Sequence, residues 1–153
     1  MSDSEKACFA SHFALWQRCV ELNEPLIILE DDIVFEPNFA QGVVKLAASP
    51  FEFVHLMALK KIKSYEILNE NIMLTFKRAS GMQGYFLHPS AAQKLIEKAR
   101  FFTYALDDFI DKYYYHKVFI LIYKPYLIDV KHYGTTITMG KKTTMIRIWC
   151  ELW

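Results

Sequence analysis

The stretch Leu26-Ile27-Ile28-Leu29-Glu30-Asp31-Asp32 joins an apolar run to three consecutive acids. The apolar run has the length and composition of a buried β-strand. Ligands of open α/β sheets bind beyond the carboxyl ends of strands, and clustered carboxylates repel one another unless a cation or hydrogen-bond donors neutralise them.

Because alternate side chains of an extended chain share a face, we expect Glu30 and Asp32 to point together and Asp31 to point away. The stretch therefore predicts a metal-assisted site for Mg²⁺ or Mn²⁺, which prefer carboxylate ligands. The alternative is that these acids cap helices or pair with lysines.

Helical and strand patterns alternate on both sides of this stretch. Ser4 or Asp3 can cap a helix that runs to about Asn23, with a buried stripe at helical intervals formed by Phe9, Phe13, Trp16 and Val20. Further helices are expected over residues 37–48, 89–100 and 107–113, and further strands over 51–57, 72–76, 83–87, 118–123 and 125–130. A turn at Ser80-Gly81 predicts that 72–76 and 83–87 form an antiparallel pair. We therefore expect a single α/β domain over 1–153, a mixed sheet flanked by helices, with a loop and C-terminal tail over 138–153.

Composition restricts the class of protein. The 153 residues are 53% hydrophobic and 23% charged, which excludes intrinsic disorder, and the net charge of +1 gives no field that would favour nucleic acid. The three cysteines, Cys8, Cys19 and Cys150, show no CxxC spacing, which favours a reducing, cytoplasmic location. No apolar stretch reaches the ~18 residues that a membrane span needs, and the first residues do not resemble a signal peptide.

Three segments near the N-terminus resemble glycosyltransferase family 25, which includes the lipooligosaccharide galactosyltransferases of Gram-negative bacteria. They are Glu5-Lys6-Ala7-Cys8-Phe9-Ala10-Ser11-His12, then Leu15-Trp16, then Leu29-Glu30-Asp31-Asp32. Members of the family carry an E-x-G-C-x-x-S-H element, a helix and a strand that ends in E-D-D. Here Ala7 stands in place of the glycine.

Later segments extend the resemblance to about Ile137. Residues 84–95, Gly-Tyr-Phe-Leu-His-Pro-Ser-Ala-Ala-Gln-Lys-Leu, are similar to the family's glycine-aromatic strand and alanine-rich helix. Ala105-Leu106-Asp107-Asp108 resembles its P-V-D-x element, with alanine in place of proline. Tyr133-Gly134-Thr135-Thr136-Ile137 is similar to its S-T-I stretch, with Thr135 in place of serine.

The resemblance implies a GT-A-like fold and an inverting transfer of sugar from a nucleotide sugar, usually UDP-galactose, with a divalent cation. It implies that Asp32 ligates Mn²⁺ or Mg²⁺, that Glu30 lies beside the metal or the ribose, and that Asp31 faces the donor sugar or a backbone contact. His132, after the last expected strand, is a third candidate metal ligand. The acceptor would be a lipid-anchored oligosaccharide, met at the cytoplasmic face of the inner membrane.

An inverting transfer needs a general base for the acceptor hydroxyl, and Asp107 is the first candidate and Asp108 the second. The alternative is that one of the two caps a helix and the other is solvated. Ser11 and His12 match the family element, and His12 either reaches the donor or is a buried histidine hydrogen-bonded locally. Gln83 and Tyr85 are expected to line the acceptor side, and the run Tyr113-Tyr114-Tyr115 should expose at least one ring to a ligand.

Family members normally have further sequence before the E-x-G-C element, including an opening strand. We therefore expect this chain to lack the first strand of the nucleotide-binding half, and its exposed edge to favour self-association. The rival hypothesis is a non-catalytic remnant, or a binding partner of another transferase, that retains the family's acids. A phosphatase-like domain with Asp31 or Asp32 as nucleophile is a more distant rival, because the surrounding motifs do not support it.

Overall fold

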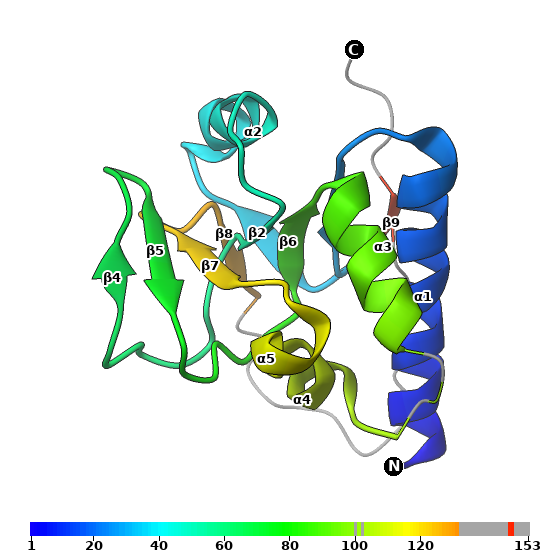
Figure 1. Ribbon diagram of the computed structural model, residues 1–153. Helices are drawn as coiled ribbons and strands as arrows, with labels where there is room; N and C mark the ends of the chain where they lie inside the picture. Colours follow the sequence, from blue (N-terminus) through cyan, green and yellow to red (C-terminus); the bar gives the residue numbers. More distant parts are fainter. Residues whose placement is uncertain (100, 102, 132–146, 149–153) are drawn as a thin grey trace.

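The fold is built on one mixed β-sheet with helices on both faces (Figure 1). The computed structural model describes residues 1–99, 101, 103–131 and 147–148. Over these residues the main sheet has seven strands in the order β4-β5-β7-β3-β6-β1-β9. Strands β3 and β7 are parallel and the other neighbours are antiparallel. The mixed α/β sheet that the sequence predicts is confirmed.

The strand bounds are short. In the main sheet they are β1 (Leu26–Leu29), β3 (Phe53–His55), β4 (Glu66–Ile67), β5 (Ile72–Thr75), β6 (Gly84–Leu87), β7 (Ile120–Tyr123) and β9 (Arg147–Ile148). A second sheet pairs β2 (Ile33–Phe35) with β8 (Ile128–Val130). The helices are α1 (Asp3–Leu22), α2 (Phe39–Ala47), α3 (Pro89–Lys98), α4 (Leu106–Ile110) and α5 (Tyr113–His116).

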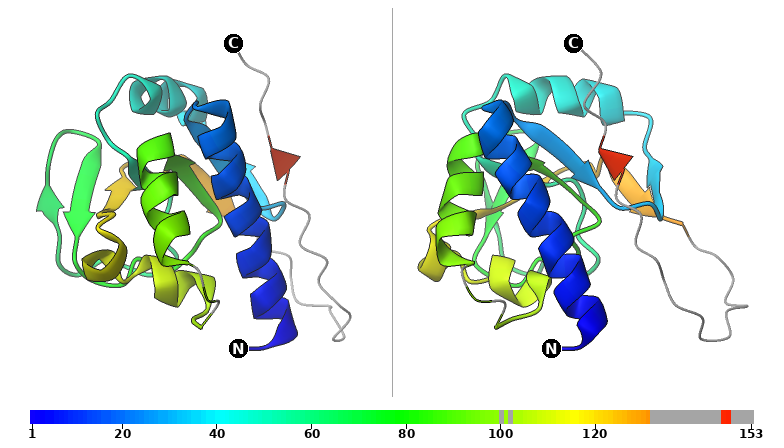
Figure 2. Two further views of the ribbon diagram at one scale, coloured as in Figure 1. Left: turned by 45° about the vertical axis from the view of Figure 1, so that its right-hand side comes forward. Right: turned by 90° about the vertical axis from the view of Figure 1, so that its right-hand side faces the viewer.

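The long helix α1 packs beside α3 on one face of the sheet (Figure 2). Its N-cap is Ser2, not Ser4 or Asp3. The Ser2 hydroxyl accepts from the Glu5 N–H, and the Glu5 carboxylate accepts from the Ser2 N–H, which is a capping box. Asn23 ends the helix in the left-handed conformation, just before Pro25. No helix in the described part of the chain is both long and apolar enough to cross a bilayer.

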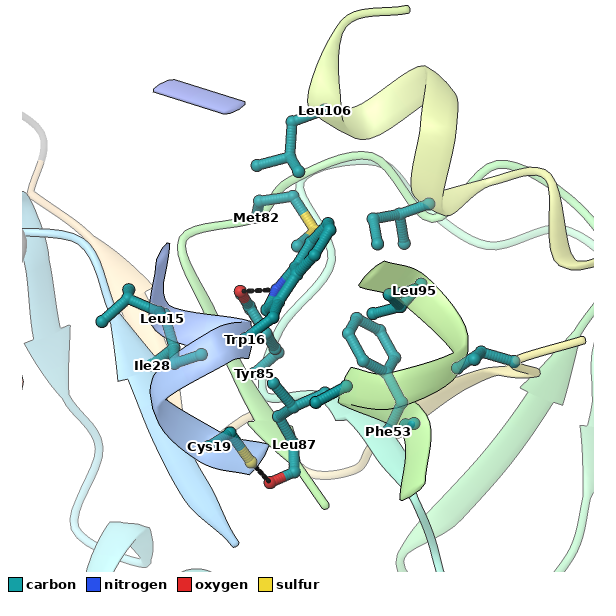
Figure 3. Close-up of a cluster of buried hydrophobic side chains, with 14 of the residues drawn as sticks. Leu15, Trp16, Cys19, Ile28, Phe53, Met82, Tyr85, Leu87, Leu95 and Leu106 are labelled. Atoms are coloured by element: carbon teal, nitrogen blue, oxygen red, sulfur yellow. Dashed lines mark hydrogen bonds between the residues drawn. The ribbon is translucent and has the colours of Figure 1, made fainter. Parts of the chain in front are cut away.

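Two layers of core fill the two faces of the sheet. Under α1, α3 and α4 lie large buried side chains, among them Phe9 and Phe109. Figure 3 labels others of this cluster, including Trp16, Phe53, Tyr85, Leu87 and Leu95. On the opposite face Leu46 of α2 packs with Val54, Phe86, Leu127 and Ile128. Strand β6 places Tyr85 and Leu87 on one face of the sheet and Phe86 on the other. Both faces are buried, which is why the sequence of the strand is an unbroken apolar run.

The predicted antiparallel pairing of 72–76 with 83–87 is wrong. Both segments are strands, but β7 and β3 lie between β5 and β6 in the sheet. Strand β5 instead pairs along its whole length with β7, from Ile72 opposite Tyr123 to Thr75 opposite Ile120. The short β2 was not predicted, because only Ile33 of its three residues is buried and the strand has no alternating pattern long enough to detect.

Candidate functional site

The acidic stretch begins where β1 ends and the chain turns. Strand β1 stops at Leu29, the Glu30 N–H donates to the Gln83 carbonyl at 2.8 Å, and Asp31 and Asp32 form a turn that leads into β2. The expectation that Glu30 and Asp32 share a face required an extended chain. That condition fails beyond Leu29, so the side chains of the three acids are placed by the turn and not by strand alternation.

Asp32 has the carboxylate of this stretch that best fits a cation. Its Oδ1 atom is buried and has no hydrogen-bond partner among the described residues. Its backbone carbonyl accepts from the Lys131 N–H at 2.8 Å, which fixes the turn against the end of β8. The Lys131 ammonium donates to the carbonyl of Asp31 at 3.3 Å. A buried carboxylate oxygen without a donor is costly, and a bound cation would remove that cost.

Glu30 lies with residues of α1. One ligand atom from each of Cys8, His12 and Glu30 falls within 4.8 Å of the other two. Burial raises the pKa of the Cys8 thiol, and the charges of Glu30 and Asp107 raise it further. Helix α1, the end of β1 and the start of α4 therefore converge on one electronegative region.

His12 and Tyr85 belong to a buried hydrogen-bonded group beneath this region. The Tyr85 hydroxyl lies 2.8 Å from His12 Nδ1. It also accepts from Trp16 Nε1 at 2.9 Å, as Figure 3 shows. Both His12 and Tyr85 have an exposed fraction of 0%. Burial lowers the pKa of His12 to about 4 and raises the pKa of Tyr85. The structure thus places Tyr85 in the core and not on an acceptor surface, and the partner of His12 comes from β6 and not from its own helix.

Ser11 and Gln83 take different positions. The Ser11 hydroxyl donates to the Ala7 carbonyl one turn earlier at 3.0 Å, an ordinary bond within α1. Gln83 Oε1 is buried without a hydrogen-bond partner in the described part of the chain. It lies against Gly81, whose φ of +105° and lack of a side chain allow this close approach.

Arg78 pairs with two acids in and just after α4. The Arg78 guanidinium forms ion pairs with Asp108 and, through Nε at 3.0 Å, with Asp111. Burial raises the pKa of Asp107, and the charge of Asp111 adds to the effect, while a hydrogen bond from the Gly81 backbone opposes it. Sequence reasoning missed Arg78 and Asp111. The recurrence of acids at 107, 108 and 111, which lie near one another on a helix surface, is the signal that could have found Asp111.

Two further expectations concern the periphery. The tyrosine run does expose rings, because the exposed fraction is 61% for Tyr114 and 47% for Tyr115. His132 and most of the 138–153 tail lie outside the described residues.

The mixed sheet flanked by helices, with three acids at the carboxyl end of β1, is consistent with an α/β glycosyltransferase-like fold. The model of glycosyltransferase family 25, described as an LPS biosynthesis protein family, matches residues 1–110. The chain belongs to glycosyltransferase family 25.

Curated relatives match shorter segments. A "Glycosyltransferase 25 family member" of Anopheles gambiae is 50% identical over 48 residues, which are 29% of this chain and 8% of that protein. One of Aedes aegypti is 43% identical over 47 residues, 30% of this chain and 8% of that protein. "Lipooligosaccharide biosynthesis protein lic2B" of Haemophilus influenzae is 46% identical over 39 residues, 25% of this chain and 15% of that protein. The matched segments therefore span a small part of each relative.

Proposed function

We propose that the chain transfers galactose from UDP-galactose to a lipooligosaccharide or lipopolysaccharide acceptor, with inversion at the anomeric carbon. The family description and the name of the Haemophilus relative support a role in the synthesis of such saccharides. The observation that carries the proposal is the convergence of Glu30 and Asp107, from separate elements, on the region around Cys8. Inverting transfer requires a general base beside the acceptor hydroxyl, and a carboxylate in this region can supply it.

Asp107 is the general base in this proposal. The acceptor oxygen forms a bond to the anomeric carbon, the bond from that carbon to the UDP oxygen breaks, and the acceptor proton passes to the Asp107 carboxylate. Burial raises the pKa of Asp107, which makes the carboxylate a stronger base than a solvated aspartate. Asp108 is less suited to the role, because its carboxylate is already paired with the Arg78 guanidinium.

Asp32 is the residue that we propose for a Mn²⁺ or Mg²⁺ ion, since its buried Oδ1 has no donor among the described residues. When bound, such a cation stabilises the charge that develops on the diphosphate leaving group. Gln83 presents a buried amide oxygen that can accept from a hydroxyl of the donor. The exposed rings of Tyr114 and Tyr115 follow α4 in the chain and offer flat faces for an acceptor sugar.

The acceptor is a lipid-anchored oligosaccharide in this proposal, and the reaction takes place on the cytoplasmic side of the inner membrane, where nucleotide sugars are made. The chain would associate with that surface peripherally.

Calorimetric titration with UDP-galactose tests the donor site. We expect binding in the presence of Mn²⁺, no binding with a chelator, and loss of binding in Asp32→Asn. The control is Asp129→Asn, which makes the same change on an exposed residue of β8 and should bind as the unmodified chain does. In a turnover assay with a lipooligosaccharide acceptor, Asp107→Asn should retain donor binding and lose at least about 100-fold in rate.

The absence of binding at millimolar UDP-galactose would overturn the proposal and favour the non-catalytic remnant. Equal binding by Asp32→Asn and the unmodified chain would remove Asp32 from the donor site. Full turnover by Asp107→Asn would exclude Asp107 as the base.

A further inference from the structure

We propose that Cys8, His12 and Glu30 form a zinc-binding site, separate from the cation site proposed at Asp32. The inference does not depend on the proposed transferase activity. It rests on three donor atoms of different chemical type, from α1 and from the end of β1, that lie within 4.8 Å of one another.

The backbone holds these residues in place without a metal. Cys8 and His12 are four residues apart on α1, so both side chains project from the same face of the helix. The helix is fixed at its start by the Ser2 capping box. Glu30 is fixed by its N–H bond to the Gln83 carbonyl at 2.8 Å. The arrangement is therefore preorganised, and a metal ion would need only side-chain rotation to complete its ligand set.

His12 provides the second, independent observation. Its ring is fully buried and its Nε2 atom has no hydrogen-bond partner among the described residues. Nδ1 lies 2.8 Å from the Tyr85 hydroxyl, which itself accepts from Trp16. If Nδ1 carries the proton and donates to Tyr85, the lone pair is on Nε2 and is available for a metal. Metal-binding histidines usually donate their other N–H in this way.

The donor types select zinc over the hard cations. A thiolate, a neutral imidazole and a carboxylate are the ligands of Zn²⁺ sites, whereas Mg²⁺ and Mn²⁺ favour oxygen. The carboxylates of Glu30 and Asp107 lie near Cys8, and their charges favour a cation there. Binding would release the Cys8 proton to solvent and leave a fourth coordination position open.

The test is a titration of the purified full chain, stripped with a chelator, by Zn²⁺ and by Co²⁺. We expect one Zn²⁺ per chain and, with Co²⁺, a thiolate-to-cobalt charge-transfer band in the near ultraviolet. In Cys8→Ala the band should vanish and the Zn²⁺ affinity should fall by at least about 100-fold. Loss of a residue that only hydrogen-bonds to a metal ligand already lowers metal affinity by ~10–100-fold, and Cys8 is a ligand itself. The matched control is Cys19→Ala. Cys19 is on the same helix, but its thiol donates to the Glu24 and Leu87 carbonyls, and this variant should keep the band.

Equal Zn²⁺ affinity in Cys8→Ala and the unmodified chain would overturn the proposal, as would a Co²⁺ complex without a thiolate band. If Cys8→Ala does not fold, alkylation of the unmodified chain, followed by peptide mass spectrometry, decides the matter. Protection of Cys8 by Zn²⁺ and not by Mg²⁺ supports the site, and equal labelling with and without Zn²⁺ refutes it. No sugar nucleotide is present, so failure here leaves the transferase proposal untouched.

Discussion

Substitution of Tyr85 by phenylalanine removes one oxygen from the centre of the α1–β6 interface. The Tyr85 hydroxyl is the acceptor for Trp16 Nε1 at 2.9 Å and the partner of His12 Nδ1 at 2.8 Å, and all three side chains are fully buried. An orphaned buried donor costs about 1–3 kcal/mol, and the loss of an ordinary hydrogen bond about 1 kcal/mol. We therefore expect Tyr85→Phe to lose about 2–4 kcal/mol of unfolding free energy. For a domain of this size that is a Tm lower by about 5–15 °C.

Urea unfolding followed by far-UV circular dichroism, with chelator present, measures this difference. The control is Tyr114→Phe, which removes the same atom from a ring that is 61% exposed, and its unfolding free energy should stay within about 0.5 kcal/mol of the unmodified chain. A Tyr85→Phe variant as stable as Tyr114→Phe would show that the Tyr85 hydroxyl does not join Trp16 to His12. It would also weaken the zinc proposal, in which that hydroxyl is the hydrogen-bond partner of His12 Nδ1.

Three further outcomes follow from burial. Lowering the pH from about 6.5 to about 4 should reduce the free energy of unfolding. Burial lowers the pKa of His12 and of His55 from about 6.5 in the unfolded chain to about 4 in the folded chain, so each residue can cost up to about 3 kcal/mol over this range. Urea midpoints that do not change between these pH values would contradict this prediction. Gly84→Ala should lower the free energy of unfolding, measured by calorimetry, by about 1–3 kcal/mol. The added Cβ would meet the Ile128 side chain and lie 2.9 Å from a Leu29 methyl. An unchanged Tm would refute this close packing. Asp107→Asn should raise the Tm at pH 7. Burial raises the pKa of the folded Asp107 carboxyl, so stability is lost as the pH rises through that pKa and the carboxyl ionises, whereas asparagine stays neutral. A lower Tm for this variant would argue against the burial of the Asp107 carboxyl.

Local patterns made the main elements predictable. The stripe from Phe9 to Val20 repeats at helical spacing, and α1 buries Phe9 and Trp16 as expected. The apolar run before Glu30 ends where β1 ends. Such features depend on residues close in sequence, so one sequence is enough to detect them.

Pairing between distant strands was not predictable in the same way. A Ser80-Gly81 turn is compatible with a hairpin, but β5 gains a complete ladder with β7, which lies more than forty residues later in the chain. The Arg78 ion pairs with Asp108 and Asp111 have the same character, because nothing near Arg78 in the sequence indicates α4 as its partner. Contacts of this kind depend on the completed topology.

The acids at the end of β1 show how a turn changes the chemistry that a sequence suggests. Read as an extended chain, Glu30 and Asp32 form one oxygen-rich pair for a hard cation. The turn after Leu29 removes that constraint, and Glu30 comes within 4.8 Å of a thiol and an imidazole on α1. Asp32 keeps a buried oxygen without a donor among the described residues. In our two proposals these neighbouring carboxylates serve different ions, Glu30 with Zn²⁺ and Asp32 with Mn²⁺ or Mg²⁺. If both sites bind, chelators will remove two different ions, so loss of activity on chelation would not by itself identify the ion that serves the reaction. Re-addition of Zn²⁺ and Mn²⁺ separately, in the Cys8→Ala and Asp32→Asn variants, is what would assign each ion to its carboxylate.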